Sequence, residues 1–161
     1  MKCWIEKNVL RAIESESQRM VPKETGGLLL GYWSDNEVVI TNATMPGPRA
    51  RHRKSSYFPD SNYDGNIMAE FYFESGGITT YLGDWHSHPK GGGGLSRHDL
   101  ITLFNIATYE PARATNPIMM IEAKEQSGWV PVIWRGDFDP AGDTEYCCHL
   151  ASVEMFVFTS K

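Results

Sequence analysis

Two histidines one residue apart end an apolar run of the sequence, in the stretch Asp84-Trp85-His86-Ser87-His88-Pro89. The apolar and aromatic residues of 78–88 predict a β-strand. Because side chains at i and i+2 of a strand point to the same face, His86 and His88 can both point at one metal ion. Pro89 cannot continue a sheet ladder, so we expect the pair at the end of its strand, where a pocket can open.

A glycine loop and a helix follow this strand. Residues 91–94 are all glycine, and such a stretch holds no regular structure cheaply, so the chain can turn back closely past the histidines. A helix is predicted over 96–109, where apolar residues recur at helical spacing: Leu100, Leu103, Phe104 and Ala107. Asp99 lies in its first turn. Two imidazoles and one carboxylate leave the fourth tetrahedral position open, which is the composition of a catalytic zinc site.

Ordinary structural roles remain open for these residues. Two histidines at this spacing also arise by chance. Ser96-Arg97-His98-Asp99 matches a helix N-terminal cap, with Asp99 favourable at the positive end of the helix. The two roles of Asp99 are compatible, since a first-turn carboxylate can serve the helix and still reach a metal. Trp85 and Ser87 fall on the strand face opposite the histidines, so both are expected to have structural roles.

A zinc hydrolase also requires a base, and Glu24 is the candidate. Zinc lowers the pKa of its bound water to about 7, and a nearby carboxylate can take the proton. Glu24 precedes the apolar stretch 28–33, and Gly26 and Gly27 permit close approach to a neighbouring element. Spacing alone does not distinguish this role from that of a solvated loop glutamate.

The remaining pattern predicts one domain over 1–161, of the α/β or α+β class, with a central sheet. A helix is expected over 4–20 because apolar residues there recur near helical spacing. The other expected elements are a hairpin of strands 28–33 and 37–41, a polar loop over 46–60, a short helix over 65–75, strands 117–123 and 129–135, and a β-prone tail over 146–158.

Charge and hydropathy exclude several classes. The 161 residues carry a net charge of -5, which disfavours nucleic acid as the principal partner. No apolar stretch approaches the roughly 20 residues of a membrane-spanning helix. Charged residues throughout 1–20 leave no apolar region for a secretory signal, so we expect a cytoplasmic protein. Cys3, Cys147 and Cys148 form no disulfide framework and are expected to be reduced thiols.

One local basic segment departs from the acidic whole. Its cations are Arg49, Arg51, His52, Arg53 and Lys54. A solvated loop is the favoured interpretation, and nucleic-acid binding is disfavoured by the overall charge. A third interpretation is that these cations bind an acidic surface of a partner protein.

Three segments together resemble the JAB/MPN (JAMM) metalloprotease family: Glu24-Thr25-Gly26-Gly27-Leu28-Leu29-Leu30-Gly31, His86-Ser87-His88-Pro89 and Ser96-Arg97-His98-Asp99. The family pattern is a glutamate before the first strand, then HxHP, then a serine and an aspartate with SxxD spacing. The resemblance runs from about residue 3 to residue 135. It implies an MPN/JAB-like fold of the cytidine-deaminase type, with a central mixed β-sheet flanked by helices.

The resemblance also implies roles for individual residues. His86, His88 and Asp99 would bind one catalytic Zn²⁺ together with a water. Glu24 would be the general base that takes the water's proton and passes it to the leaving amine. Ser96 would help to hold the tetrahedral oxyanion. His98 has no family role and is expected to be exposed.

Members of the family cleave after the C-terminal tail of ubiquitin or ubiquitin-like proteins, so the implied partners are such a tail and its conjugated target. The small chain and its segment 46–50 resemble the prokaryotic branch. Some prokaryotic members belong to antiphage (CBASS) operons and deconjugate a cyclic-oligonucleotide synthase, which is the favoured expectation. Others process ubiquitin-fold sulfur carriers, which is the alternative.

The sequence disfavours two further classes of protein. An amidohydrolase barrel also places HxH at a strand end, but it requires about 250 residues, so the length of 161 disfavours it. A non-catalytic scaffold of the same fold would have lost active-site residues, whereas all five positions are intact here.

Overall fold

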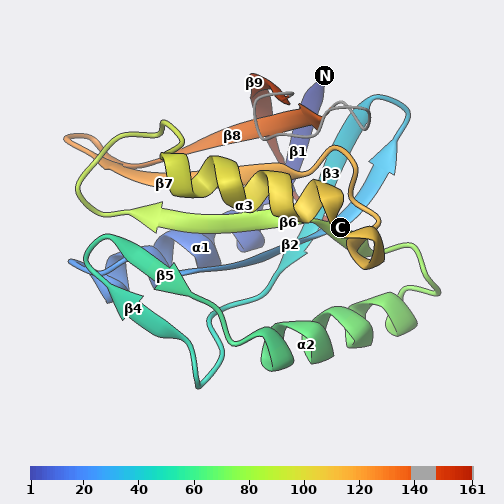
Figure 1. The fold of residues 1–161 in the computed structure, drawn as a ribbon, viewed down its shortest axis with the longest axis horizontal. Helices are drawn as coiled ribbons and strands as arrows, with labels where there is room; N and C mark the ends of the chain where they lie inside the picture. Colours follow the sequence, from blue (N-terminus) through green and yellow to red (C-terminus); the bar gives the residue numbers. More distant parts are fainter. Residues whose placement is uncertain (139–147, 161) are drawn as a thin grey trace.

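The computed structural model describes residues 1–138 and 148–160. Its main sheet closes into a barrel in the order β1-β3-β2-β6-β7-β8-β9 (Figure 1). The barrel strands are β1 (Lys2–Glu6), β2 (Gly26–Ser34), β3 (Glu37–Ala43), β6 (Thr80–His88), β7 (Ile118–Glu125), β8 (Gly128–Phe138) and β9 (Cys148–Phe158). The other elements are β4 (Arg51–Arg53), β5 (Ser56–Phe58), α1 (Lys7–Met20), α2 (Ser61–Glu74), α3 (Arg97–Thr108) and the 3-10 turn η1 (Glu110–Ala112).

Both parallel and antiparallel pairings occur in the barrel. β1 is parallel to β3 and to β9, and β6 is parallel to β7. The pairs β2–β3, β2–β6, β7–β8 and β8–β9 are antiparallel. This confirms the predicted α/β class with a mixed sheet flanked by helices. Closure of the sheet was not predicted, because it depends on the pairing of the first strand with the last.

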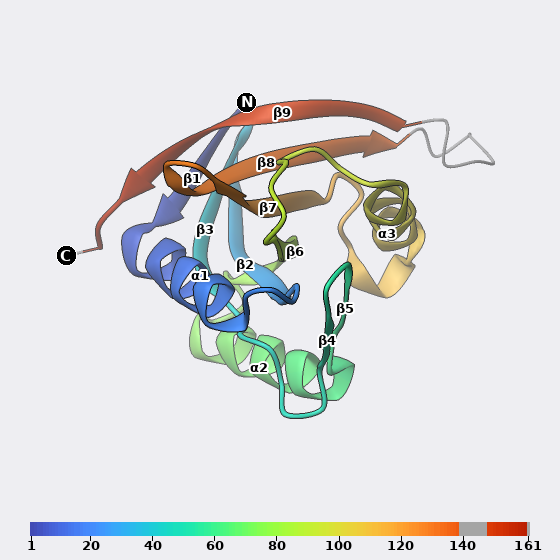
Figure 2. The ribbon, with the colours of Figure 1, turned by 90° about the vertical axis from the view of Figure 1, so that its left-hand side faces the viewer.

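The sheet separates two hydrophobic clusters. Ile13 of α1 packs in the larger one with buried residues of the strands, including Trp85 and Met120. Leu103 of α3 packs on the other face with Met119, Ile121 and Ala123. Figure 2 shows α2 and α3 apart from each other, with the β4–β5 hairpin between them.

A bulge in β6 controls which side chains face α3. Consecutive residues of β2, Leu29 and Leu30, pair with Gly83 and Tyr81, so Leu82 of β6 is the extra residue. Leu82 and Trp85 therefore both lie in the larger core, although they are three residues apart. Tyr81 and Asp84 accordingly share the opposite face, where the Tyr81 hydroxyl donates to Asp84 Oδ1 over 2.7 Å.

Three expectations of secondary structure were wrong at their boundaries. Residues 4–6 belong to β1 rather than to a helix, because they pair with β3 and β9, and Glu6 caps α1 by accepting from the Asn8 and Val9 amides. The second helix begins at Ser61 rather than at residue 65, since Asp60 accepts from the Tyr63 amide as its N-cap. The expected loop over 46–60 contains the β4–β5 hairpin.

The other expected elements are confirmed: the hairpin as β2 and β3, the histidine strand as β6, the next helix as α3, and the later strands as β7, β8 and β9. Residues 146 and 147 of the expected tail lie outside the described residues. Cys3 is buried as a free thiol, and burial raises its pKa to about 12; Cys147 lies outside the described part. Within that part, no helix combines the length and the apolar character needed to cross a membrane.

Replacement of Gly83 by alanine should destabilise the fold. Gly83 has φ +152°, and a Cβ there would lie 1.8 Å from the Ile118 carbonyl oxygen. We expect Gly83→Ala to lower the free energy of unfolding by about 3 kcal/mol, measured by urea denaturation. The control is Gly65→Ala within α2, where a Cβ meets nothing within 4 Å and alanine should stabilise by about 0.5–1 kcal/mol. Equal stabilities of the two variants would contradict this account.

Glu122 of β7 should make stability fall as the pH rises. Its side chain is buried on the α1 side, and burial, followed by the charge of Glu14, raises its pKa to about 8 from 4.5. The folded state therefore favours the protonated form, a contribution present below pH 4.5 and lost as the pH rises towards 8. Within this window wild type should lose at most about 1.4 kcal/mol of unfolding free energy per pH unit relative to Glu122→Gln.

The measurement is the free energy of unfolding of wild type and of Glu122→Gln, from denaturation curves at several pH values between 4.5 and 8. Glu125→Gln, an exposed position on the same strand, is the control and should follow wild type. A parallel pH dependence of wild type and Glu122→Gln would show that Glu122 is not the responsible group.

Candidate metal centre and its cavity

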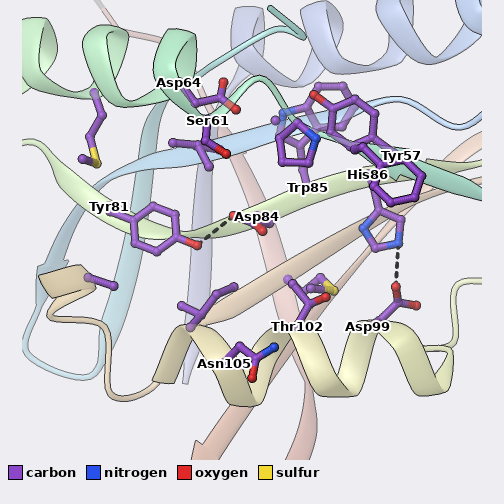
Figure 3. A pocket seen from close by; sticks show the side chains of 18 of the residues that line it. Tyr57, Ser61, Asp64, Tyr81, Asp84, Trp85, His86, Asp99, Thr102 and Asn105 are labelled. Carbon is purple, nitrogen blue, oxygen red and sulfur yellow. Dashed lines mark hydrogen bonds and ion pairs between the residues drawn. The ribbon is translucent and has the colours of Figure 1, made fainter. Parts of the chain in front are cut away.

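Three of the predicted ligands meet at the end of β6. The ligand atoms of His86, His88 and Asp99 all lie within 4.8 Å of one another. His86 Nε2 is 3.1 Å from His88 Nε2 and 3.2 Å from Asp99 Oδ1, while His88 Nε2 is 3.9 Å from Asp99 Oδ2. Figure 3 shows Asp99 rising from α3 towards His86 on the strand.

These separations suit a small divalent cation. Bonds of about 2.0–2.2 Å to a tetrahedral zinc ion place neighbouring ligand atoms about 3.3–3.5 Å apart. The measured separations of 3.1, 3.2 and 3.9 Å span this range. Two imidazole nitrogens that face each other have no reason to converge unless a proton or a cation lies between them. The donor set therefore fits a metal ion.

A carbonyl of the glycine loop sets which ring nitrogen of His88 carries a hydrogen. His88 Nδ1 lies 2.8 Å from the Gly92 carbonyl oxygen, which can only accept, so Nδ1 carries the proton and Nε2 keeps its lone pair. Gly91 and Gly92 have φ values of +85° and +90°, which favour glycine. The predicted return of this loop past the histidines is confirmed, and it supplies the outer hydrogen bond that orients a metal ligand.

Asp99 has both of the roles left open by the sequence. Its Oδ2 accepts from the Ser96 amide over 2.6 Å, and its own amide donates to Ser96 Oγ over 3.2 Å, which is a complete capping box. Its Oδ1 meanwhile faces His86. Burial by itself would raise the pKa of Asp99, but the His86 and Ser96 hydrogen bonds outweigh burial and lower it to about 2. Asp99 is therefore an anionic donor at any ordinary pH.

Glu24 lies in the same cavity, and the β4–β5 hairpin holds its backbone. The Glu24 amide donates to the Arg53 carbonyl over 2.7 Å, and His52 Nδ1 donates to the Glu24 carbonyl over 3.0 Å. On the other side of Glu24, the Ser87 amide donates to the Thr25 carbonyl, and the Thr25 amide donates to the Ser87 hydroxyl.

Partial burial raises the pKa of Glu24, and the nearby His86 and His88 oppose this shift. The half-buried carboxylate thus favours gaining a proton more than a solvated glutamate does.

The close approach predicted for Gly26 and Gly27, the first two residues of β2, is also confirmed. A Cβ on Gly26 would lie 2.5 Å from the Trp85 carbonyl oxygen and 2.9 Å from the Tyr57 ring. A Cβ on Gly27 would lie 2.2 Å from the Thr44 carbonyl oxygen. Ser87 and Trp85 are buried behind the ligands as expected, with Trp85 Nε1 donating to the Thr44 carbonyl.

A cavity of about 1350 Å³ extends from this cluster (Figure 3). The β6 strand contributes to its floor, and α2, the β4–β5 hairpin and α3 contribute to its walls. Glu24, Ser96 and the three clustered donors all line it, and so does His98, which is exposed as expected. The structure therefore brings every predicted site residue to one cavity.

Sequence analysis missed several groups that line this cavity or lie beside it. His52 belongs to a segment that was interpreted as a solvated loop, and no local pattern indicates its contact with Glu24, 28 residues away. Tyr81 and Asp84 are three residues apart, and only the bulge places them on one face. Arg51 and Arg53 of the basic segment are exposed, but both guanidinium groups also lie over the Phe58 ring, at 5.1 and 5.4 Å from its centroid.

Known proteins share both the sequence pattern and the fold. Residues 6–135 match the family model described as prokaryotic homologs of the JAB domain. A protein of Sinorhizobium fredii named "Probable metalloprotease y4qB" is 36% identical over 135 residues, covering 83% of this chain and 82% of that protein.

More distant relatives include two proteins named "CD-NTase/cGAS isopeptidase". The Enterobacter hormaechei protein is 24% identical, covering 77% of this chain and 68% of its own length, and the Escherichia coli protein is 26% identical, covering 51% and 53%. The solution structure of protein DSY2949 from Desulfitobacterium hafniense shares the fold with a TM-score of 0.68 at 14% identity, covering 98% of this chain and 94% of that one. From the family match and the relative in Sinorhizobium fredii, the chain belongs to the prokaryotic branch of the JAB domain family of metallopeptidases.

Proposed function

We propose that this chain is a zinc-dependent peptidase that cleaves after the C-terminal tail of a ubiquitin-like protein and releases it from a conjugated target. The observation that carries the proposal is the convergence of His86, His88 and Asp99 within 4.8 Å at a cavity that Glu24 also lines. A structural zinc site would be closed by four protein ligands, whereas three donors beside an open cavity are typical of a catalytic site.

Each residue has a distinct proposed task. A zinc ion at this site supplies a Lewis acid and a more acidic water. Glu24 accepts a proton as a general base and delivers it to the leaving nitrogen, and its partly buried carboxylate suits both steps. The Ser96 hydroxyl already accepts from the Asp99 amide, which leaves its own proton free to donate to a developing oxyanion.

The substrate class is supported by two relatives. Both proteins named "CD-NTase/cGAS isopeptidase" suggest a nucleotidyltransferase as the conjugated target and a role in antiviral defence. Processing of a ubiquitin-fold sulfur carrier is the alternative within the same chemistry. Incubation of the zinc-loaded protein with a ubiquitin-like conjugate and with a linear fusion, both encoded beside its gene, tests the two. Cleavage of neither by wild type, with zinc bound, would favour a scaffold.

Glu24→Gln should abolish turnover without loss of metal. Glutamine keeps the shape of the side chain but cannot accept a proton, so kcat should fall by about 10²–10⁴-fold. Zinc content, measured by elemental mass spectrometry, should stay at the wild-type level because all three donors remain. Turnover at the wild-type rate would contradict the proposed role of Glu24.

Loss of a donor should remove zinc and activity together. We expect His88→Ala to purify without stoichiometric zinc, and Asp99→Asn to bind it more weakly because the anionic donor is lost. A chelator should inactivate wild type, and added zinc should restore it. His149→Ala on β9 is the matched control and should keep both properties. Full activity of metal-free His88→Ala would rule out the metal mechanism.

A further inference from the structure

Two carboxylates that the proposed mechanism does not use also line the cavity. Asp84 lies on β6 two residues before His86 and therefore, by the alternation of a strand, on the same face as the metal ligands. Residues i and i+2 of a strand are about 7 Å apart, so Asp84 lies close to the proposed reaction centre. Asp64 lies on α2, and Figure 3 shows it above the strand that carries Asp84.

The hydrogen bonds of these groups are incomplete. Asp84 Oδ1 accepts from the Tyr81 hydroxyl, and Asp64 Oδ1 accepts from Thr44 Oγ1 over 2.8 Å. Asp64 is only 3% exposed, yet its Oδ2 has no partner among the described residues, and neither has the buried Tyr57 hydroxyl in the same cavity wall. A buried polar atom without a partner is costly, so a hydrogen-bond donor bound in the cavity would be stabilised by these oxygens.

The absence of ion pairs at Asp84 and Asp64 among the described residues also favours a ligand that donates hydrogen bonds and carries a positive charge. Within residues 1–138 and 148–160, neither Asp84 nor Asp64 forms an ion pair with a lysine or arginine, whereas neighbouring Asp60 is paired with Arg49. The pKa of Tyr57 is raised, first by burial and then by the charges of Asp64 and Asp84, so both carboxylates lie near enough to the Tyr57 hydroxyl to act on it. The lysines that line the cavity, Lys54 and Lys90, leave these carboxylates unpaired.

We propose that Asp84, Asp64 and Tyr57 form a subsite for an arginine side chain of the substrate. A guanidinium is planar, keeps its charge and presents five N–H donors, so it can serve two carboxylates and a hydroxyl oxygen at once. An extended substrate advances about 3.3 Å per residue, which places this arginine about two to three residues from the scissile bond. The subsite rests on the proposed function and narrows its substrates to tails or targets with a basic residue at that distance.

Binding of short peptides tests the subsite without requiring turnover. The probes are acetylated tetra-alanine amides with a single arginine at each position, each matched by citrulline, which has nearly the same shape without the charge. Titration calorimetry on the zinc-loaded wild type should show, for at least one position, arginine binding at least about tenfold more tightly than citrulline. In Asp84→Asn and in Asp64→Asn this ratio should fall towards one.

The control is Glu74→Gln, an exposed position on α2, which should keep the wild-type ratio. Zinc content and thermal melting check that the variants are folded, and the wild-type comparison of arginine with citrulline depends on no variant. Equal binding of arginine and citrulline at all four positions, or an unchanged ratio in both folded variants, would overturn the subsite. If a conjugate is cleaved but arginine is not preferred, the subsite is wrong and the proposed peptidase function still holds. If arginine is bound selectively but no conjugate is cleaved, the subsite holds and the proposed function is wrong.

Discussion

The pairing of β6 between β2 and β7 is the constraint on which the site depends. Antiparallel pairing sets Gly26 opposite His86, and this brings the end of the preceding segment, with Glu24, to the metal cluster. Parallel pairing sets His86 beside Ile121, whose face α3 covers. Because the strand is bonded along both edges, its two histidines cannot shift relative to Glu24 or α3 without breaking the sheet. The ligand geometry is therefore built into the barrel.

The N-terminus of α3 joins helix stability to chemistry. One oxygen of Asp99 completes the capping box with Ser96, and the other faces His86. Helix capping and metal binding both favour the ionised carboxylate, so they reinforce rather than oppose each other. The same box fixes the Ser96 hydroxyl at the cavity, since this oxygen accepts from the Asp99 amide. A capping motif and a ligand motif can thus share the same two residues without conflict.

The hairpin and α2 enclose the cavity beside the cluster of metal donors. His52 and Arg53 fix the backbone of Glu24, while the ring of Tyr57, from the same hairpin, packs against Gly26 at the start of β2. Asp64 adds a buried carboxylate from α2. The hairpin contacts come from residues 46–60, which were expected to form a polar loop. The walls of the cavity are therefore built by the hairpin and α2, while the metal donors come from β6 and α3.

The sequence by itself determined the short-range features. The i, i+2 histidines, the glycine loop and the capping pattern of Asp99 each follow from local periodicity or spacing, and the family pattern added Glu24. The tertiary structure decided whatever depends on distant partners. The strand at Lys2–Glu6 was mistaken for helix because its β3 and β9 partners lie far along the chain. That Tyr81 and Asp84 share a face depends on a bulge against β2, and no local pattern encodes a register.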